Sequence, residues 1–208
     1  MIQRIEYLDN LKALKDKQVI KVIAGVRRCG KSTFFEVYID YLRKMGTEDR
    51  QIISINLEDL ENADLLDYKS LYNHIKNKLV PDKMNYVFID EVQKCVGFEK
   101  AVDSLFIKKN CDVYITGSNA YLLSGELATL LSGRYIQIDM LPFSFKESTK
   151  ESGKSKQELF DAYLRYGSFP YVAYLENDEK IISQYIEGVY NTILIKDVAI
   201  REKINDIT

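Results

Sequence analysis

The sequence predicts an α/β fold, in which helices cover both faces of a parallel sheet and a smaller helical part follows. Short runs rich in Ile, Val and Tyr alternate with longer amphipathic stretches over the first two-thirds of the chain. Most of these runs are nearly continuous in apolar residues, as expected of strands that are buried on both faces. Beyond residue 156 the pattern is helical only. Alternation of this kind predicts βαβ units and a parallel sheet.

The predicted strands are Val19–Ala24, Ile52–Leu57, Tyr86–Ile89, Val113–Thr116 and Tyr135–Ile138. The predicted helices are Lys31–Met45, Leu66–Leu79, Phe98–Lys108, Tyr121–Leu131, Gln157–Tyr166 and Asp178–Ile200. In the first helix, one apolar stripe at helical spacing predicts the face that packs on the sheet, formed by Phe34, Phe35, Tyr38, Ile39 and Leu42. A boundary near Lys150 divides a core of residues 1–150 from a lid-like helical subdomain of residues 151–208. We expect this subdomain to be incomplete, because a segment this short is too small to bury a hydrophobic core of its own.

Composition excludes several classes of protein. The chain has 208 residues, 29 of them Lys or Arg and 31 Asp or Glu, which gives a formal net charge of −2. Bulk charge therefore does not hold it to nucleic acid, although a local basic patch stays open. Every apolar run falls short of the roughly 18 residues that span a membrane, and the N-terminus lacks a signal-peptide pattern. Three widely spaced cysteines and one histidine fit neither a disulfide framework nor a zinc site. We expect a cytoplasmic protein with no membrane partner.

Residues Gly25–Ser32 match G-x-x-x-x-G-K-[ST], the pattern of the phosphate-binding P-loop. The match follows a predicted strand and opens a predicted helix, as phosphate binding requires. Glycines let backbone N–H groups turn toward the phosphates, and the helix N-terminus adds its positive dipole end. We expect Lys31 to reach the β- and γ-phosphates of ATP and Ser32 to bind Mg²⁺. The predicted nucleotide-binding residues here are Gly25, Val26, Arg27, Arg28, Cys29, Gly30, Lys31, Ser32 and Thr33.

A Walker B pattern follows in the predicted strand Tyr86–Ile89, which ends in Asp90 and Glu91. Asp90 can hold the Mg²⁺ shell. Glu91 points to the other side of the pleat, where a base would polarise an attacking water. Together the two motifs predict a three-layer P-loop NTPase that depends on Mg²⁺.

Polar residues also follow the next predicted strand, Val113–Thr116. In open parallel sheets, ligands lie beyond the carboxyl ends of the strands. Thr116 and Asn119 are therefore candidates to orient the attacking water. Asn119 can instead cap the helix that is predicted from Tyr121, and the two interpretations stay open.

Cys29 precedes Gly30 in the loop, next to a helix N-terminus. This position predicts a depressed thiol pKa and a reactive cysteine. We accordingly expect bound nucleotide to protect Cys29 from alkylation.

The order of these motifs resembles that of the AAA+-related ATPases of bacteria and archaea, in particular the branch whose ATPase core precedes a C-terminal domain of unknown function. The resemblance covers about Arg4 to Arg201 and rests on the P-loop followed by I-D-E-V-Q, I-T-G-S-N, L-S-G-R-Y, L-P-F-S-F-K-E and G-S-F-P. It implies an additional-strand sheet of order 5-1-4-3-2, with the Thr116 strand between the P-loop strand and the Asp90 strand. It also implies that Glu91 is the catalytic base and that a sensor residue ends strand four.

Two departures from this family matter. Its members continue into a further domain, so we expect a chain that stops at Thr208 to be a fragment of a longer protein. The G-S-F-P segment has Gly167-Ser168 where a double glycine is more usual. We still expect Gly167 and Pro170 to approach the nucleotide.

Arg134 is the candidate contact to a neighbouring subunit. It precedes the predicted strand Tyr135–Ile138, and the start of a parallel strand lies opposite the nucleotide, so Arg134 cannot reach its own γ-phosphate. Related AAA+ ATPases place an arginine finger here, acting on the next subunit of an oligomer. A structural salt bridge, or a charge at the C-terminus of the preceding helix, explains the residue equally well. The finger interpretation predicts a homo-oligomer.

The leading functional prediction is ATP binding and hydrolysis, coupled to an unknown protein or nucleic-acid client. A GTPase would need a guanine-reading N-K-x-D, and Asn77–Val80 fails at the last position. A small-molecule kinase stays open, because Asp90 and Glu91 can serve an acceptor hydroxyl. A nucleotide-sensing module with little hydrolysis also stays open, since hydrolysis can require an oligomer.

Overall fold

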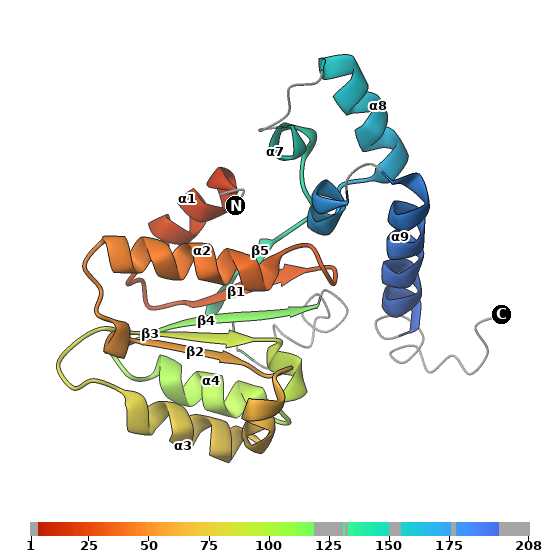
Figure 1. Cartoon of the computed structure of the whole chain (residues 1–208). Helices are drawn as coiled ribbons and strands as arrows, with labels where there is room; N and C mark the ends of the chain where they lie inside the picture. The colour runs from red at the N-terminus through yellow and green to blue at the C-terminus, as the bar shows by residue number, and fades with distance from the viewer. Residues whose placement is uncertain (1–3, 119–130, 132, 150–154, 176–177, 196–208) are drawn as a thin grey trace.

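The computed structural model of the chain describes residues 4–118, 131, 133–149, 155–175 and 178–195. Five parallel strands form its sheet in the order β2-β3-β4-β1-β5 (Figure 1). This is the predicted order 5-1-4-3-2, read from the other edge, and the prediction is confirmed. The strands are β1 (Ile20–Gly25), β2 (Ile52–Asn56), β3 (Asn85–Asp90), β4 (Cys111–Ser118) and β5 (Tyr135–Asp139).

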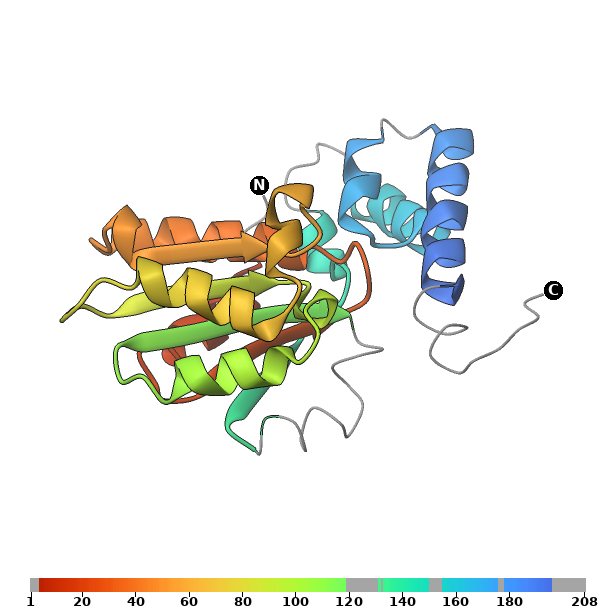
Figure 2. The same ribbon diagram turned by 90° about the horizontal axis from the view of Figure 1, so that it is seen from below.

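Helices cover both faces of the sheet. Figures 1 and 2 show α1 (Ile5–Ala13) and α2 (Lys31–Lys44) on one face and α3 (Tyr68–Lys78) and α4 (Phe98–Phe106) on the other. The three inner strands are therefore buried along their whole length, as their continuous apolar runs predicted.

The predicted apolar stripe of α2 is buried and packs with α1 and the strands in one core cluster. Phe88 and Tyr114 stack at the centre of this cluster, with ring centroids 4.7 Å apart. A second cluster lies under α3 and α4, where Leu71, Ile75 and Leu105 pack on the opposite face of the sheet. Two separate cores thus fix the sheet from both sides.

Local signals explain where the helices begin. Asp67 accepts hydrogen bonds from the N–H groups of Lys69 and Ser70 at the start of α3, as an N-cap residue does. Short 3₁₀ helices complete the connections at η1 (Asp49–Gln51), η2 (Leu60–Leu65) and η3 (Val92–Lys94). The predicted helix 121–131 lies outside the described residues, apart from Leu131.

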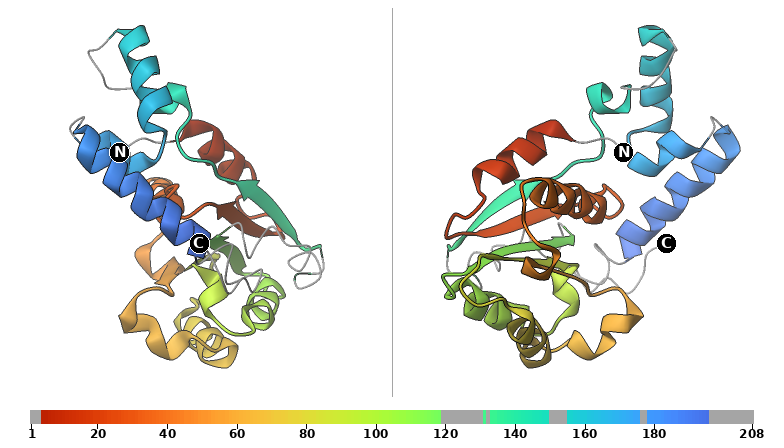
Figure 3. Two further views of the ribbon diagram at one scale, coloured as in Figure 1. Left: turned by 90° about the vertical axis from the view of Figure 1, so that its right-hand side faces the viewer. Right: turned by 60° about the vertical axis from the view of Figure 1, so that its left-hand side comes forward.

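Among the described residues after β5, the regular elements are all helical: α7 (Phe145–Ser148), α8 (Lys156–Tyr166), η4 (Pro170–Tyr174) and α9 (Glu179–Ile193). Asp178 caps α9 through the N–H groups of Lys180 and Ile181. Figure 1 shows α9 beyond the carboxyl ends of the strands, and Figure 3 shows α7 and α8 extending away from the sheet. We call residues 145–193 of the described chain the helical part. The domain boundary near Lys150 stays a prediction.

Candidate nucleotide-binding site

The phosphate-binding loop connects β1 to α2, and its backbone geometry favours glycine at both Gly25 and Gly30. A Cβ at Gly25 would lie 2.4 Å from the carbonyl oxygen of Met140 and 2.7 Å from Cys29 Sγ, so a larger residue does not fit. Gly30 has a φ of +100°, in the left-handed region that favours glycine, and it caps α2. The structure thus forms the strand–loop–helix unit that the sequence pattern predicted.

Lys31 is buried in the first turn of α2. Its Nζ donates to the carbonyl oxygens of Gly25 (3.1 Å) and Val26 (3.3 Å) and lies 3.7 Å from Glu91 Oε1. A phosphate in the loop would compete with these acceptors for the ammonium. The cation and the carboxylate that the two motifs supply therefore meet at one place. Ser32 and Thr33 are exposed at the same end of α2.

The two acids at the end of β3 are held by β4. Thr116 is fully buried, and its Oγ1 accepts a hydrogen bond from the Glu91 N–H (3.0 Å) and donates to Asp90. The Thr116 hydroxyl is therefore hydrogen-bonded to both acidic residues, to the backbone of Glu91 and to the carboxylate of Asp90. Its role in orienting a water stays a prediction, and Asn119 lies outside the described residues.

Glu91 has a left-handed backbone, with φ 54° and ψ 49°. This conformation is unfavourable for a residue with a side chain, and the turn of η3 that follows maintains it. Gln93, in η3, donates from Nε2 to Glu91 Oε2 at 2.5 Å. Sequence reasoning missed this partner, because the Gln of I-D-E-V-Q has no chemical signal of its own.

Three consecutive residues of the loop lie near distant parts of the chain. The Cys29 carbonyl accepts from the Arg4 guanidinium at 3.2 Å. A Cβ at Gly30 would lie 3.6 Å from Pro170 of η4. Arg28 lies close enough to Tyr185 of α9 to oppose the rise in the Tyr185 pKa that burial causes. The helical part therefore borders the loop directly.

Of the two predicted residues in the G-S-F-P segment, Pro170 lies next to the loop. Gly167 ends α8 with a φ of +74°, and a Cβ there would meet no atom of the described chain within 4 Å. The neighbouring Ser168 carbonyl accepts from the Phe143 N–H at 2.8 Å, which ties this segment to the connection after β5. Contact of Gly167 and Pro170 with nucleotide stays a prediction.

Arg4 is a buried cation that the sequence did not single out. Besides Cys29, it donates to the Pro142 carbonyl (3.2 Å) and pairs with Glu147 of α7 (3.1 Å). Its guanidinium lies over the rings of Tyr7 and Phe143. Arg4 also lines a cavity of about 490 Å³ between the start of α1 and the helical part. It therefore joins the N-terminus, the loop and α7.

Arg27 and Arg134 form ion pairs within the chain. Arg27 lies 3.6 Å from Glu58, and Arg134 Nη1 lies 3.7 Å from Asp103 Oδ1. The Arg134 carbonyl accepts from Ile20, the first residue of β1, so Arg134 lies at the end of the sheet opposite the loop, as expected. Its role as a finger stays a prediction.

The predicted reactivity of Cys29 is wrong. The thiol is completely buried, and burial raises its pKa although Lys31 and Arg4 act in the opposite direction. Desolvation outweighs the helix N-terminus here. The expected protection from alkylation by nucleotide thereby loses its basis.

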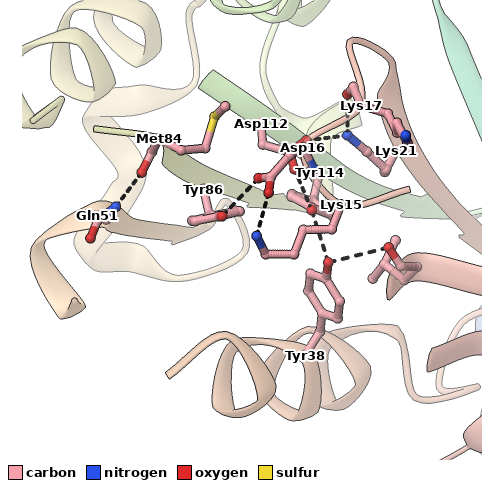
Figure 4. Close-up of polar contacts among 11 residues, drawn as sticks. Lys15, Asp16, Lys17, Lys21, Tyr38, Gln51, Met84, Tyr86, Asp112 and Tyr114 are labelled. Atoms are coloured by element: carbon pink, nitrogen blue, oxygen red, sulfur yellow. Dashed lines mark hydrogen bonds and ion pairs between the residues drawn. The ribbon is translucent and has the colours of Figure 1, made fainter. Parts of the chain in front are cut away.

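A polar network that the sequence did not predict lies at the amino ends of the strands (Figure 4). Lys21 and Asp112 form an ion pair that is buried inside the protein. The carboxylate also accepts from the Tyr114 hydroxyl and the Asp16 N–H, each at 2.8 Å. Burial raises the pKa of Asp112 and lowers that of Lys21, while the ion pair opposes both shifts. This network is remote from the loop, so its role is structural.

A parallel sheet with a phosphate loop after a central strand, and two acids at the end of the strand two places away, defines the P-loop class of nucleotide-binding proteins. Comparison with known proteins agrees. Residues 17–149 match the model of a family described as an AAA domain (AAA_14). The chain belongs to this family of AAA+-related, ATPase-like nucleotide-binding proteins.

Two curated relatives are uncharacterized. The chain is 40% identical to a protein of Haemophilus influenzae over 212 residues, covering 99% of this chain and 52% of that protein. It is 30% identical to the protein MJ1544 of Methanocaldococcus jannaschii over 233 residues, covering 96% of this chain and 49% of the relative. The chain thus spans about half the length of these relatives.

Solved structures support the fold. The Walker-type ATPase PABY2304 of Pyrococcus abyssi has a TM-score of 0.63 at 16% identity, over 99% of this chain and 77% of that chain. The AMPPCP-bound DnaA of Aquifex aeolicus has a TM-score of 0.52 at 16% identity, over 98% and 65%. Within the described residues, no helix is both long and apolar enough to cross a membrane.

Proposed function

We propose that the chain binds ATP with Mg²⁺ and hydrolyses it, and that a protein or nucleic-acid client uses the energy. The observation that carries this proposal is the 3.7 Å separation of Lys31 Nζ and Glu91 Oε1. A phosphate-binding cation and a candidate base converge at the carboxyl edge of the sheet, where ligands of such sheets lie. Membership of an ATPase-like family supports the same reaction. We further propose a cytoplasmic location, where its three buried free thiols would stay reduced.

The residues have separate roles in this reaction. Backbone N–H groups of the loop and the Lys31 ammonium bind the phosphates, so Lys31 exchanges Glu91 for phosphate oxygens. Glu91 then takes a proton from a water whose oxygen attacks the γ-phosphorus. The bond from this phosphorus to the bridging oxygen breaks, and ADP and phosphate leave.

The donors at the site fit Mg²⁺. The ion prefers hard oxygen ligands and is usually held by one or two protein groups together with substrate phosphates. The buried Asp90 carboxylate, which Thr116 orients, and the exposed Ser32 hydroxyl are such groups. When bound, the ion neutralises charge that develops on the phosphates.

Phosphate release from ATP and GTP, with nucleotide affinity measured in parallel, tests the proposal. We expect Lys31→Ala to weaken ATP binding. Glu91→Gln should keep affinity within about threefold while turnover falls by a factor on the order of 100 or more, because only the base is lost. Equal turnover of the wild type and Glu91→Gln would contradict the assignment of the base.

A nucleotide-sensing module with little hydrolysis is the second candidate. The contacts of the loop with η4 and α9 favour it, because they give bound nucleotide a direct route to the helical part. Tight ATP binding with negligible phosphate release, unchanged by Glu91→Gln, is the result that would favour sensing over hydrolysis.

We also propose that Arg134 acts on the nucleotide of a neighbouring copy of the chain. Its guanidinium is about half exposed and weakly paired with Asp103, so it can leave that partner. Turnover per subunit should rise with protein concentration, and Arg134→Ala should remove the rise. Turnover that stays constant throughout the range of assembly would contradict the finger.

A further inference from the structure

Gln93 is the second contact of the candidate base. Glu91 has two carboxylate oxygens, of which Oε1 faces the Lys31 ammonium at 3.7 Å and Oε2 accepts from Gln93 Nε2 at 2.5 Å. A hydrogen bond to a charged acceptor is shorter and stronger than a neutral one. Gln93 therefore makes the shorter of the two contacts with the Glu91 carboxylate.

The orientation of the Gln93 amide follows from its partner. A carboxylate only accepts hydrogen bonds, so the NH₂ group must face it and the carbonyl Oε1 must point away. Oε1 is buried and has no hydrogen-bond partner among the described residues. A buried carbonyl without a donor is unfavourable, so this atom has a free acceptor position.

Glu91 needs such a contact because its other restraints act on the backbone. Thr116 holds the N–H group, and η3 holds the left-handed turn. At the carboxylate, Lys31 is the only contact besides Gln93 that the described residues show, and phosphate binding takes Lys31 away. After this exchange, Gln93 is the remaining contact of the carboxylate among the described residues.

We infer that Gln93 is a positioning residue, which holds the Glu91 carboxylate for proton transfer and offers Oε1 to a water in the same site. This inference rests on the proposed hydrolysis and deepens it. It adds to the proposed machinery a residue two positions after the base, at the end of the I-D-E-V-Q pattern.

The test is Gln93→Met, which keeps the length of the side chain and removes the amide. We expect kcat for ATP to fall about tenfold or more while the dissociation constant of ATP changes less than about threefold, because only the base is misplaced. Gln51→Met is the matched control, since Gln51 donates to the Met84 carbonyl at 2.7 Å, outside the site (Figure 4). It should lose comparable stability and keep kcat within about twofold.

A double-mutant cycle of Gln93→Met with Glu91→Asp distinguishes a positioning role of Gln93 from a purely structural one. The shorter carboxylate no longer reaches the amide, so adding Gln93→Met to Glu91→Asp should cost much less than adding it to the wild type. An equal cost in both backgrounds would overturn the inference. So would a kcat like that of the control, or a loss of affinity in proportion to kcat.

Failure of the two proposals is distinguishable. If the wild type releases no phosphate at any protein concentration, hydrolysis and the role of Gln93 both fall. If Glu91→Gln abolishes turnover while Gln93→Met leaves it intact, hydrolysis stands and only the positioning role is wrong.

Discussion

Thr116 Oγ1 accepts a hydrogen bond from the Glu91 N–H at 3.0 Å and donates one to the Asp90 carboxylate. One hydroxyl of β4 thereby fixes both acids at the end of β3. The metal ligand and the base proposed above consequently depend on a residue that need not touch the nucleotide.

We predict that Thr116→Val destabilises the chain by about 1–3 kcal/mol, because it leaves a buried N–H and a buried carboxylate without their partner. Turnover should fall as well, since both acids lose their anchor. Urea unfolding and phosphate release measure the two effects. Thr116→Ser keeps the hydroxyl and should retain most of both; a Val variant as stable as the wild type would show that the hydroxyl is dispensable.

The pair between Arg4 and Glu147 should make stability depend on pH. Burial opposes ionisation of Glu147, but the Arg4 guanidinium and the Ser144 contacts outweigh it and hold the Glu147 pKa below its ordinary value of 4.5. A depressed pKa in the folded state gives stabilisation that is complete above about pH 4.5 and is lost as the pH falls through the lower, folded value. In urea unfolding between pH 7 and pH 3, Glu147→Gln should lose less free energy of unfolding than the wild type. Parallel losses in the two proteins would contradict this.

For the buried pair of Lys21 and Asp112, we predict that a second substitution restores stability that the first one removes. Lys21→Met leaves a buried carboxylate without its cation and should cost about 3–5 kcal/mol. Adding Asp112→Asn removes that charge and keeps an acceptor for Tyr114, so the double variant should be more stable than Lys21→Met alone. Chemical denaturation compares them. Additive losses would mean that the pair does not act as a unit.

All three cysteines should react slowly with alkylating reagents in the folded protein. Burial raises the pKa of Cys95 and of Cys111 to about 11, and it also raises that of Cys29. Labelling followed by mass spectrometry should be slow with or without ATP and fast in denaturant. Rapid labelling of Cys29 that ATP prevents would restore the interpretation drawn from the sequence.

The sequence sufficed for those features that a local pattern encodes. The strands of the core, the α2 stripe, the loop and the Asp90–Glu91 pair all follow from periodicity or from spacing, and the strand order came from a family resemblance. Helix α1 was missed, since Arg4 stands at its N-cap in a left-handed conformation and offers no capping signal. Arg4, Gln93 and the pair of Lys21 with Asp112 depend on contacts that only the folded chain creates. Cys29 was misjudged because it is buried in one core cluster with Tyr114 and Met140, which are distant from it in sequence.

The position of β4 between β1 and β3 has a mechanical consequence. Adjacent strands are about 4.8 Å apart, so the loop strand and the acid-bearing strand are separated by about 10 Å of rigid, hydrogen-bonded backbone. A rearrangement of α9 or η4 would therefore leave the spacing of these two strands unchanged. A client that acted through the helical part would therefore control when nucleotide occupies the site. The distance between the loop strand and the acid-bearing strand would still be set by the sheet.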